Sequence, residues 1–88
     1  MRDIQLRPEA LDDLQDLLDV NKKLVVRVLR IFKECRKTPF EGIGKPEALK
    51  GNFKGYWSRR IDDEHRMIYQ VTDDIIIVIG IKGHYDDK

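Results

Sequence analysis

Apolar and polar residues alternate at the start of the chain and then recur with a helical period. Residues 2–7 alternate, with Ile4 and Leu6 on one side, which predicts a half-buried strand. Leucines then follow Pro8 at helical spacing, with aspartates between them, which predicts an amphipathic helix with an acidic outer face. A second helix is predicted over residues 22–36, with Asn21 as its N-cap. Because the link is so short, the two helices should form an antiparallel hairpin.

Turn-forming residues fill the segment 38–55, and a loop of this length in a small domain is more often functional than filler. Three strands are predicted after it, over residues 56–61, 66–71 and 75–81, with acidic pairs at the two hairpin turns. The last strand is a continuous β-branched run, typical of a central strand buried on both faces. The predicted order is therefore β-α-α-β-β-β in a single domain of residues 1–88. This is an α+β fold with a small, mostly antiparallel, twisted sheet and the helical hairpin on one face.

The composition limits the class of protein. A chain of 88 residues makes one small domain with a thin core, and no apolar run is long enough to span a bilayer. The first residues lack the continuous hydrophobic stretch of a secretory signal, and Cys35 has no second cysteine with which to form a disulfide. We therefore expect a cytoplasmic protein with no membrane partner.

The net charge of +1 conceals an uneven distribution. Between residues 20 and 37 the chain carries seven basic residues and a single acid, Glu34, and a second basic stretch over residues 45–60 contains only Glu47 as an acid. The other acidic residues lie mainly before and after these stretches. Such segregation gives a positive face, which is typical of proteins that bind phosphate groups. A solvated helix surface would show the same pattern, so charge alone suggests nucleic acid without establishing it.

Three arginines in the predicted sheet could act together on a phosphate. Arg59 and Arg60 are adjacent on a predicted strand, so they point to opposite faces. Arg66 lies in the next strand and should share a face with one of them. Two guanidinium groups on one open face repel each other, and such an arrangement usually awaits an anion. Taken singly, each arginine is as consistent with a structural role.

An acid and a base complete this set. Glu47 lies in the basic loop, and His84-Tyr85 follows the last predicted strand. These groups can cleave a ribose phosphodiester without a metal, because the 2′-hydroxyl must lose a proton, the 5′-oxygen must gain one, and the phosphorane carries extra charge. No closely spaced set of metal ligands is present, so we expect no metal and no cofactor. Cys35 falls at the spacing of a buried helical residue.

Four motifs occur in order: Lys45-Pro46-Glu47 with Leu49-Lys50-Gly51, Trp57-Ser58-Arg59-Arg60-Ile61, Glu64-His65-Arg66, and His84-Tyr85. Together they resemble the YoeB/Txe toxins of bacterial toxin–antitoxin modules, within the wider RelE/ParE group. The resemblance implies a RelE/ParE-like fold and a ribosome-dependent, metal-independent endoribonuclease that cuts mRNA in the ribosomal A site. It also implies inhibition by a YefM/Axe-type antitoxin and binding to operator DNA only through the toxin–antitoxin complex. Whether the toxin forms a homodimer is left open.

The resemblance also implies roles for single residues. Glu47 matches the general base, His84 the general acid, and Arg66 the arginine that stabilises the scissile phosphate. Tyr85 matches a tyrosine that helps to orient the substrate. Cationic RNA contacts are expected at Lys50, Arg60 and the adjacent Arg59. Ribosome contacts are expected on the second helix, at Lys22, Lys23, Arg27 and Arg30.

Two positions near the motifs are expected to stay outside the site. His65 alternates to the opposite face from Arg66, which indicates a structural role. The tail Asp86-Asp87-Lys88 departs from the family pattern, in which the chain commonly stops at the His-Tyr pair. It would place two carboxylates near an anionic substrate, or it would point into solvent, and we favour the second.

Two other functions are consistent with parts of the pattern. A ParE-like toxin of the same fold would poison DNA gyrase and would need no acid–base pair, so the presence of both Glu47 and His84-Tyr85 argues against it. A non-enzymatic binding module would depend on the basic second helix alone. In that case charge reversal on the helix would abolish activity and Glu47→Ala would change nothing.

Overall fold

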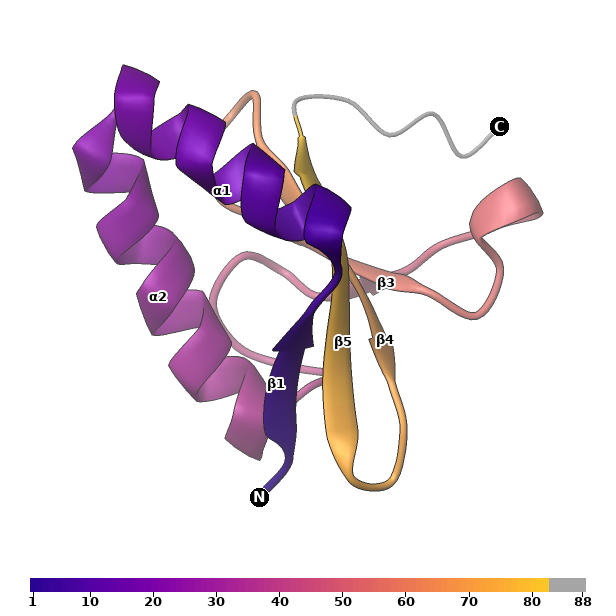
Figure 1. Cartoon of the computed structure of the whole chain (residues 1–88). Helices are drawn as coiled ribbons and strands as arrows, with labels where there is room; N and C mark the ends of the chain where they lie inside the picture. The colour runs from indigo at the N-terminus through magenta and orange to yellow at the C-terminus, as the bar shows by residue number, and fades with distance from the viewer. Residues whose placement is uncertain (83–88) are drawn as a thin grey trace.

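The computed structural model describes residues 1–82 (Figure 1). The first half of the chain forms the predicted elements: β1 (Asp3–Leu6), α1 (Pro8–Val20) and α2 (Lys22–Lys37). Pro8 lies in the first turn of α1, where its missing N–H would have had no helical partner. The side chain of Asn21 accepts a hydrogen bond from the backbone N–H of Lys23 and so caps α2. The predicted helical hairpin and its N-cap are confirmed.

The second half forms five short elements: β2 (Glu47–Ala48), the 3-10 turn η1 (Gly51–Phe53), β3 (Trp57–Arg60), β4 (Arg66–Val71) and β5 (Ile75–Lys82). The three predicted strands are present, with small shifts at their ends. Strand β2 was not predicted, because two residues are too few to show an alternating pattern.

The strands form one mixed sheet in the order β1-β5-β4-β3-β2. Strand β1 runs parallel to β5, and the other neighbours are antiparallel. The β-branched strand β5 is therefore interior, with β1 on one side and β4 on the other, as its continuous apolar run predicts (Figure 1). No helix in residues 1–82 is long and apolar enough to cross a bilayer.

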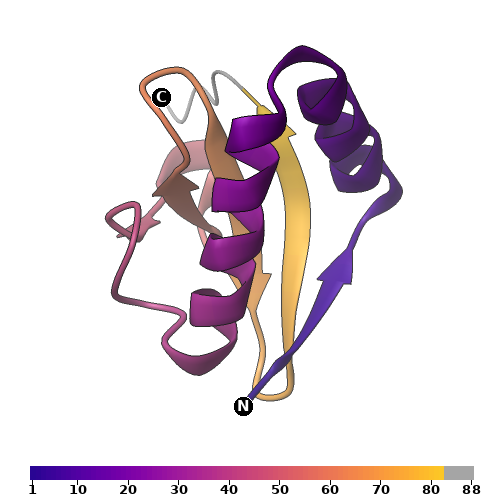
Figure 2. The same ribbon diagram turned by 90° about the vertical axis from the view of Figure 1, so that its left-hand side faces the viewer.

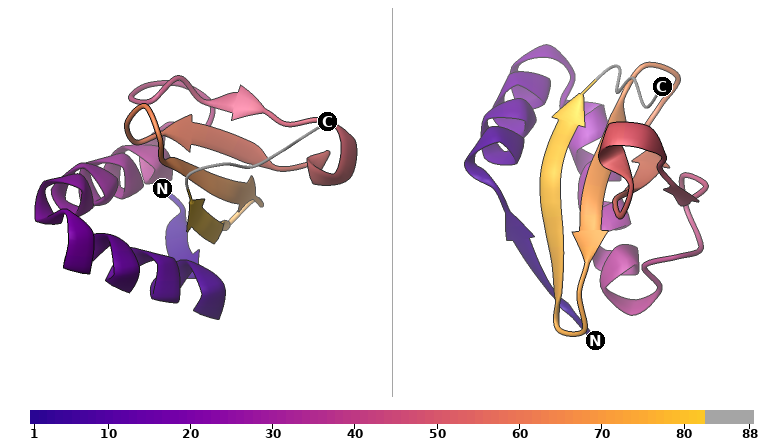
Figure 3. Two further views of the ribbon diagram at one scale, coloured as in Figure 1. Left: turned by 90° about the horizontal axis from the view of Figure 1, so that it is seen from above. Right: turned by 90° about the vertical axis from the view of Figure 1, so that its right-hand side faces the viewer.

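The two helices cover different parts of the sheet. Helix α2 lies over one face, and α1 crosses in front of β5 on the β1 side (Figures 1 and 2). Above the end of β1, the carboxylate of Asp13 accepts a hydrogen bond from the backbone N–H of Ile81 at 3.0 Å. Neither helix stands in front of β3 and β4 when the sheet is viewed from the side away from α2 (Figure 3, right). We call this side the open face.

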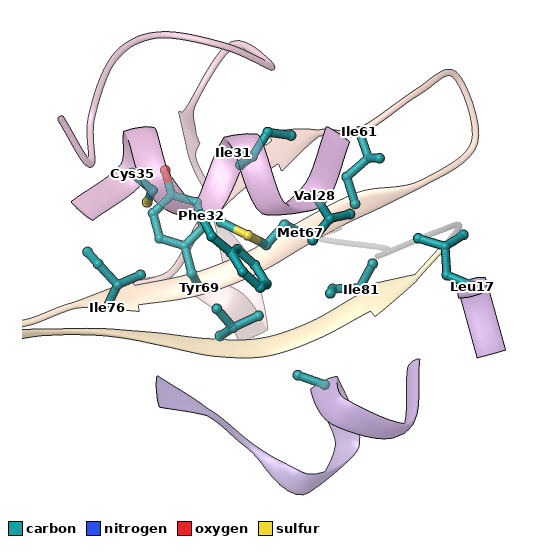
Figure 4. Close-up of a cluster of buried hydrophobic side chains, with 12 residues drawn as sticks. Leu17, Val28, Ile31, Phe32, Cys35, Ile61, Met67, Tyr69, Ile76 and Ile81 are labelled. Atoms are coloured by element: carbon teal, nitrogen blue, oxygen red, sulfur yellow. The ribbon is translucent and has the colours of Figure 1, made fainter. Parts of the chain in front are cut away.

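The core lies between the sheet and the helices (Figure 4). Ile76, Val78 and Ile81 of β5 all face this core, although their spacing breaks strict alternation. The β4–β5 ladder shifts register between Ile68 and Tyr69, and this irregularity accounts for the break. The other buried members of the cluster are Ala10, Leu17, Val28, Ile31, Phe32, Cys35, Ile61, Met67 and Tyr69. Cys35 is fully buried, so the prediction of a small core residue is confirmed. Its burial raises the pKa of the thiol.

Candidate active site

The pairing of β3 with β4 brings two arginines together on the open face. Arg60 pairs directly with Arg66, and side chains of directly opposed residues have Cβ atoms about 5 Å apart. Alternation puts Arg60 on the face of Ser58, while Arg59 lies on the core side with Trp57. The prediction that Arg66 shares a face with one of the adjacent arginines is confirmed. Within residues 1–82, neither Arg60 nor Arg66 has a carboxylate within ion-pair distance.

Strand β2 adds a carboxylate to the same face. Glu47 pairs with Ser58, so its side chain lies on the face of Ser58 and diagonally across from Arg60. Glu47 and Arg60 are exposed, and Arg66 is partly exposed. Three neighbouring strands therefore present one acid and two guanidinium groups to solvent in a compact patch. We call Glu47, Arg60 and Arg66 the acid–arginine patch.

The residues that adjoin this patch on the same face of the sheet are buried. Ser58 and Ile68 pair across β3 and β4 and are 1% and 0% exposed, respectively. Leu49, just after β2, is also buried. Charges next to buried residues are screened less than charges surrounded by water, so the patch should attract an anion more strongly than isolated surface arginines would.

A projecting turn borders the patch. The chain leaves β2, forms η1 and returns as β3, and this turn stands out from the sheet on the open side (Figures 1 and 3). Lys50 precedes η1 and is exposed. Its predicted role as an RNA contact is compatible with this position.

Arg59 is fully buried, so the prediction that it contacts RNA is wrong for this position. Its five N–H groups donate five hydrogen bonds, all within the protein. The acceptors are the Tyr69 hydroxyl, one carboxylate oxygen of Glu34, and the carbonyl oxygens of Thr38, Glu41 and Ile43. Arg59 and Arg60 thus have opposite surroundings although they are adjacent.

The electrostatics of this buried cluster follow from its contacts. Burial acts to lower the pKa of Arg59, but the hydrogen bonds to Tyr69 and Glu34 outweigh it and the pKa is raised. Glu34 pairs with Arg59 at 2.8 Å between Oε1 and the guanidinium nitrogen. Burial raises the pKa of Tyr69 to about 12, despite the opposing effect of Arg59. Arg59 therefore stays charged and Tyr69 stays a neutral hydrogen-bond donor over the physiological range.

Sequence reasoning did not assign Glu34 or Tyr69 to this cluster. One signal was present: Glu34 is the single acid in a basic helix, and a charge that is buried in a protein needs a partner of opposite sign. Tyr69 gave no such signal, because an aromatic residue in an alternating strand is typical of an ordinary core position.

The basic residues of α2 form a separate surface. Lys22, Lys23, Arg27 and Arg30 are all exposed. Helix α2 covers the face of the sheet opposite the acid–arginine patch (Figures 1 and 2). The two sets of cations that the sequence predicted are thus on different sides of the molecule.

Two predicted catalytic residues, His84 and Tyr85, lie outside the described residues, as do Asp86, Asp87 and Lys88. Lys82, two residues before His84 in the sequence, pairs with Arg66 at the end of β5. Among residues 1–82 no three acidic, histidine or cysteine side chains gather as metal ligands. Because His84 is not among them, a metal-free site stays a prediction.

His65 takes part in a local turn. Asp62 accepts hydrogen bonds from the backbone N–H groups of Glu64 and His65, and lies 3.0 Å from Nδ1 of His65. Burial of Asp62 acts to raise its pKa, but these hydrogen bonds outweigh it and the pKa is lowered. The predicted structural role of His65 fits this arrangement.

Comparison with known proteins identifies the family. Residues 6–85 match the family model described as the YoeB-like toxin of bacterial type II toxin–antitoxin systems. The toxin YoeB of Mycobacterium bovis is 44% identical over 97% of this chain and 100% of its own length. The structure of a YoeB dimer from Staphylococcus aureus is 40% identical with a TM-score of 0.86, covering 96% of this chain and 98% of that chain. The toxin in a heterotetrameric YoeB–YefM complex from Staphylococcus aureus is also 40% identical with a TM-score of 0.84, covering 97% and 99%. The chain therefore belongs to the family of YoeB-like toxins of bacterial type II toxin–antitoxin systems.

Proposed function

We propose that this toxin is a ribosome-dependent endoribonuclease that cleaves mRNA in the ribosomal A site and so inhibits translation. The observation that carries the proposal is the acid–arginine patch, in which one carboxylate and two guanidinium groups share the open face. A base and fixed cations in that arrangement suit a reaction in which an oxygen nucleophile is deprotonated beside a phosphate that gains charge.

Each group has a distinct part in the proposed reaction. The carboxylate of Glu47 accepts the proton of the ribose 2′-hydroxyl as that oxygen attacks the adjacent phosphorus. The bond to the 5′-oxygen breaks, and His84 donates a proton to this leaving oxygen, which gives a 2′,3′-cyclic phosphate and a 5′-hydroxyl. Arg66 and Arg60 stabilise the charge on the phosphorane oxygens. The reaction involves no oxidation or reduction, and it needs no metal or other cofactor.

Two further residues hold the RNA. Lys50 binds the backbone beside the projecting turn, and Tyr85 helps to orient the nucleotide. Both are proposed from the family resemblance, and the exposed position of Lys50 supports its part.

The position of the basic helix surface supports ribosome dependence. Helix α2, which carries the exposed Lys22, Lys23, Arg27 and Arg30, lies on the side of the sheet away from the acid–arginine patch. A toxin in the A site could therefore contact ribosomal RNA with one side and mRNA with the other. The ribosome holds the mRNA in the in-line geometry that this small site could not impose alone, which lowers the entropic part of the barrier.

The relatives indicate the protein partners. In Staphylococcus aureus a YoeB toxin forms a heterotetrameric complex with YefM and is also found as a dimer. We propose a YefM-type antitoxin for this toxin as well, with operator DNA bound only through the toxin–antitoxin complex. Self-association is proposed on the same ground, and the whole system is proposed to act in the cytoplasm.

Replacement of Glu47 tests the proposed mechanism. The variant Glu47→Ala should lower mRNA cleavage in a translating extract by about 10²–10⁴-fold, because the proton acceptor is lost. The 5′ ends of mRNA after brief induction give the cleavage sites and their yield. The matched control Glu64→Ala removes an exposed carboxylate from the β3–β4 turn and should cut at the wild-type rate.

Cleavage by Glu47→Ala at the wild-type rate would reject the proposed base. Inhibition of gyrase supercoiling by stoichiometric toxin, with mRNA left intact, would instead identify a ParE-like poison.

A further inference from the structure

The loop between α2 and β2 has little regular secondary structure, yet side chains from the sheet form hydrogen bonds to many of its backbone carbonyl groups. The carbonyl oxygens of Thr38, Glu41 and Ile43 accept hydrogen bonds from Arg59. The carbonyl oxygen of Pro39 accepts from the Tyr69 hydroxyl at 2.6 Å. Buried polar atoms with no partner are absent from the described side chains. The loop is thus fixed from inside by two side chains of the sheet.

The carboxylate of Glu34 locks the middle of this loop. One oxygen, Oε1, accepts from Arg59 at 2.8 Å and from the backbone N–H of Ile43 at 2.6 Å. Gly42 passes so close that an added Cβ would lie 1.8 Å from the same oxygen, and its φ of +115° also favours glycine. Loop and cluster therefore fit each other closely.

The last anchored point of the loop is next to the acid–arginine patch. The carbonyl oxygen of Gly44 accepts from the backbone N–H of Arg60 at 2.7 Å. Three residues later Glu47 enters β2, which is only two residues long. A strand this short has few hydrogen bonds of its own. The position of the Glu47 side chain therefore depends on the loop that leads to it.

From these contacts we propose that Arg59 is a positioning residue for the nuclease: with Glu34 and Tyr69 it clamps the loop 38–44, and the clamped loop sets the place of Glu47 relative to Arg60 and Arg66. This inference rests on the proposed function, in which Glu47 is the general base. Arg59 itself touches no substrate, because its side chain is 0% exposed.

A purely stabilising role accounts poorly for an arginine at this place. Removing an ion pair from water costs free energy, and well-packed apolar side chains of similar volume are often at least as stable. What the guanidinium group supplies, and an apolar side chain cannot, is a set of fixed directions for five hydrogen bonds. Four of the five acceptors belong to the loop or to the carboxylate that holds it.

Two conservative variants test the clamp without an empty core. Tyr69→Phe removes the donor to Pro39 and the acceptor of Arg59 Nε but keeps the buried ring. Arg59→Met removes all five donors and keeps an unbranched side chain. Thr72→Ala is the matched control, because it removes hydrogen bonds to the backbone of Asp74 and Ile75 in the distant β4–β5 turn.

The expected result is a loss of turnover that depends on Glu47. On programmed ribosomes Tyr69→Phe should lower kcat by roughly 10- to 100-fold with little change in KM, because misplacement of a reacting group by even about 1 Å can cost this much. In the Glu47→Ala background the same change should cause no further loss. Thr72→Ala should leave kcat near wild type in both backgrounds. Hydrogen exchange at the Arg60 amide should accelerate in Tyr69→Phe, while amides of the β4–β5 ladder keep their protection.

The results that would overturn the positioning role differ from those that would overturn the proposed function. An equal loss for Tyr69→Phe in both backgrounds would show that the clamp only keeps the protein folded, and this overturns the positioning role. Unchanged kcat and unchanged exchange at the Arg60 amide in both Tyr69→Phe and a folded Arg59→Met would also overturn it. Wild-type cleavage by Glu47→Ala alone would instead reject the proposed function. A variant that does not fold is recognised by its circular dichroism, and Tyr69→Phe then decides the matter.

Discussion

At the scale of single residues, Arg59 and Arg60 show how one strand can serve two tasks. They are neighbours in the chain, but alternation sends one guanidinium group into the core and the other to the open face. The buried one meets five acceptors, whereas the exposed one lies opposite Arg66. Like charges directly opposed on a sheet destabilise the fold. The open face therefore carries strain that a bound phosphate would relieve.

Tyr69 should make the folded protein sensitive to alkaline pH. Its pKa is raised to about 12 by burial, against an ordinary value of about 10. The stabilising contribution of the neutral phenol is therefore complete below about pH 10 and is lost as the pH rises through about 12, with a size on the order of 3 kcal/mol.

Urea unfolding between pH 9 and 12 measures this effect. Wild type should lose more free energy of unfolding over that range than Tyr69→Phe, which has no phenol to ionise. Burial raises the pKa of the Cys35 thiol and its hydrogen bond with Tyr69 acts to lower it, so both proteins should carry Cys35→Ala in this comparison. Parallel pH dependence of the two proteins would show that Tyr69 ionises as easily in the folded state as in the unfolded state.

At the scale of elements, helix α2 has two faces with different tasks. Val28, Ile31, Phe32 and Cys35 pack into the core, while the lysines and arginines between them face solvent. Glu34, the one acid of the helix, turns toward the core and pairs with Arg59. Helix α2 thus contributes residues to the core, supplies Glu34 to the cluster around Arg59, and presents a positive surface to solvent.

The positive surface of α2 should govern affinity for the ribosome more than the chemical step. A Lys23→Glu, Arg27→Glu double variant should bind ribosomes more weakly and show a shallower dependence of affinity on salt, because fewer counterions are released from RNA. At saturating ribosomes kcat should stay near wild type. Sedimentation at several salt concentrations measures the affinity. Asp12→Lys on α1 is a control that changes the net charge away from this surface.

If the double variant instead loses all activity while Glu47→Ala keeps it, the protein is a binding module and not a nuclease. An unchanged salt dependence would show that α2 does not contact ribosomal RNA.

At the scale of the whole molecule, stability should be unevenly distributed. Strand β4 pairs along its full length with β5, whereas β2 contributes two residues to one edge. Native-state hydrogen exchange should therefore give the greatest protection to the amides of β4 and β5, approaching the free energy of global unfolding, and the least to β2 and η1. Equal protection at Leu49, whose amide bonds to the carbonyl of Tyr56, would contradict this order.

The sequence predicted the elements well and the clamp not at all. The helices, the three longer strands and the expectation that Arg66 shares a face with either Arg59 or Arg60 all follow from local patterns, which a single sequence contains. Which of the two adjacent arginines is buried depends on Glu34, far earlier in the chain, and on Tyr69 in the next strand. Local patterns carry no such pairing. Arg59 was therefore placed with Arg60 among the RNA contacts, and β2 was too short to be predicted.

The parallel pairing of β1 with β5 affects when the chain can fold during its synthesis. Asp3 pairs with Ile75, and most of the intervening chain must be in place before this contact can form. Helix α1 likewise depends on β5, since Asp13 reaches Ile81. A polypeptide cut short before residue 75 would retain the helical hairpin and lack the strand that completes its core. We therefore expect a copy that ends before β5 not to fold into an active toxin.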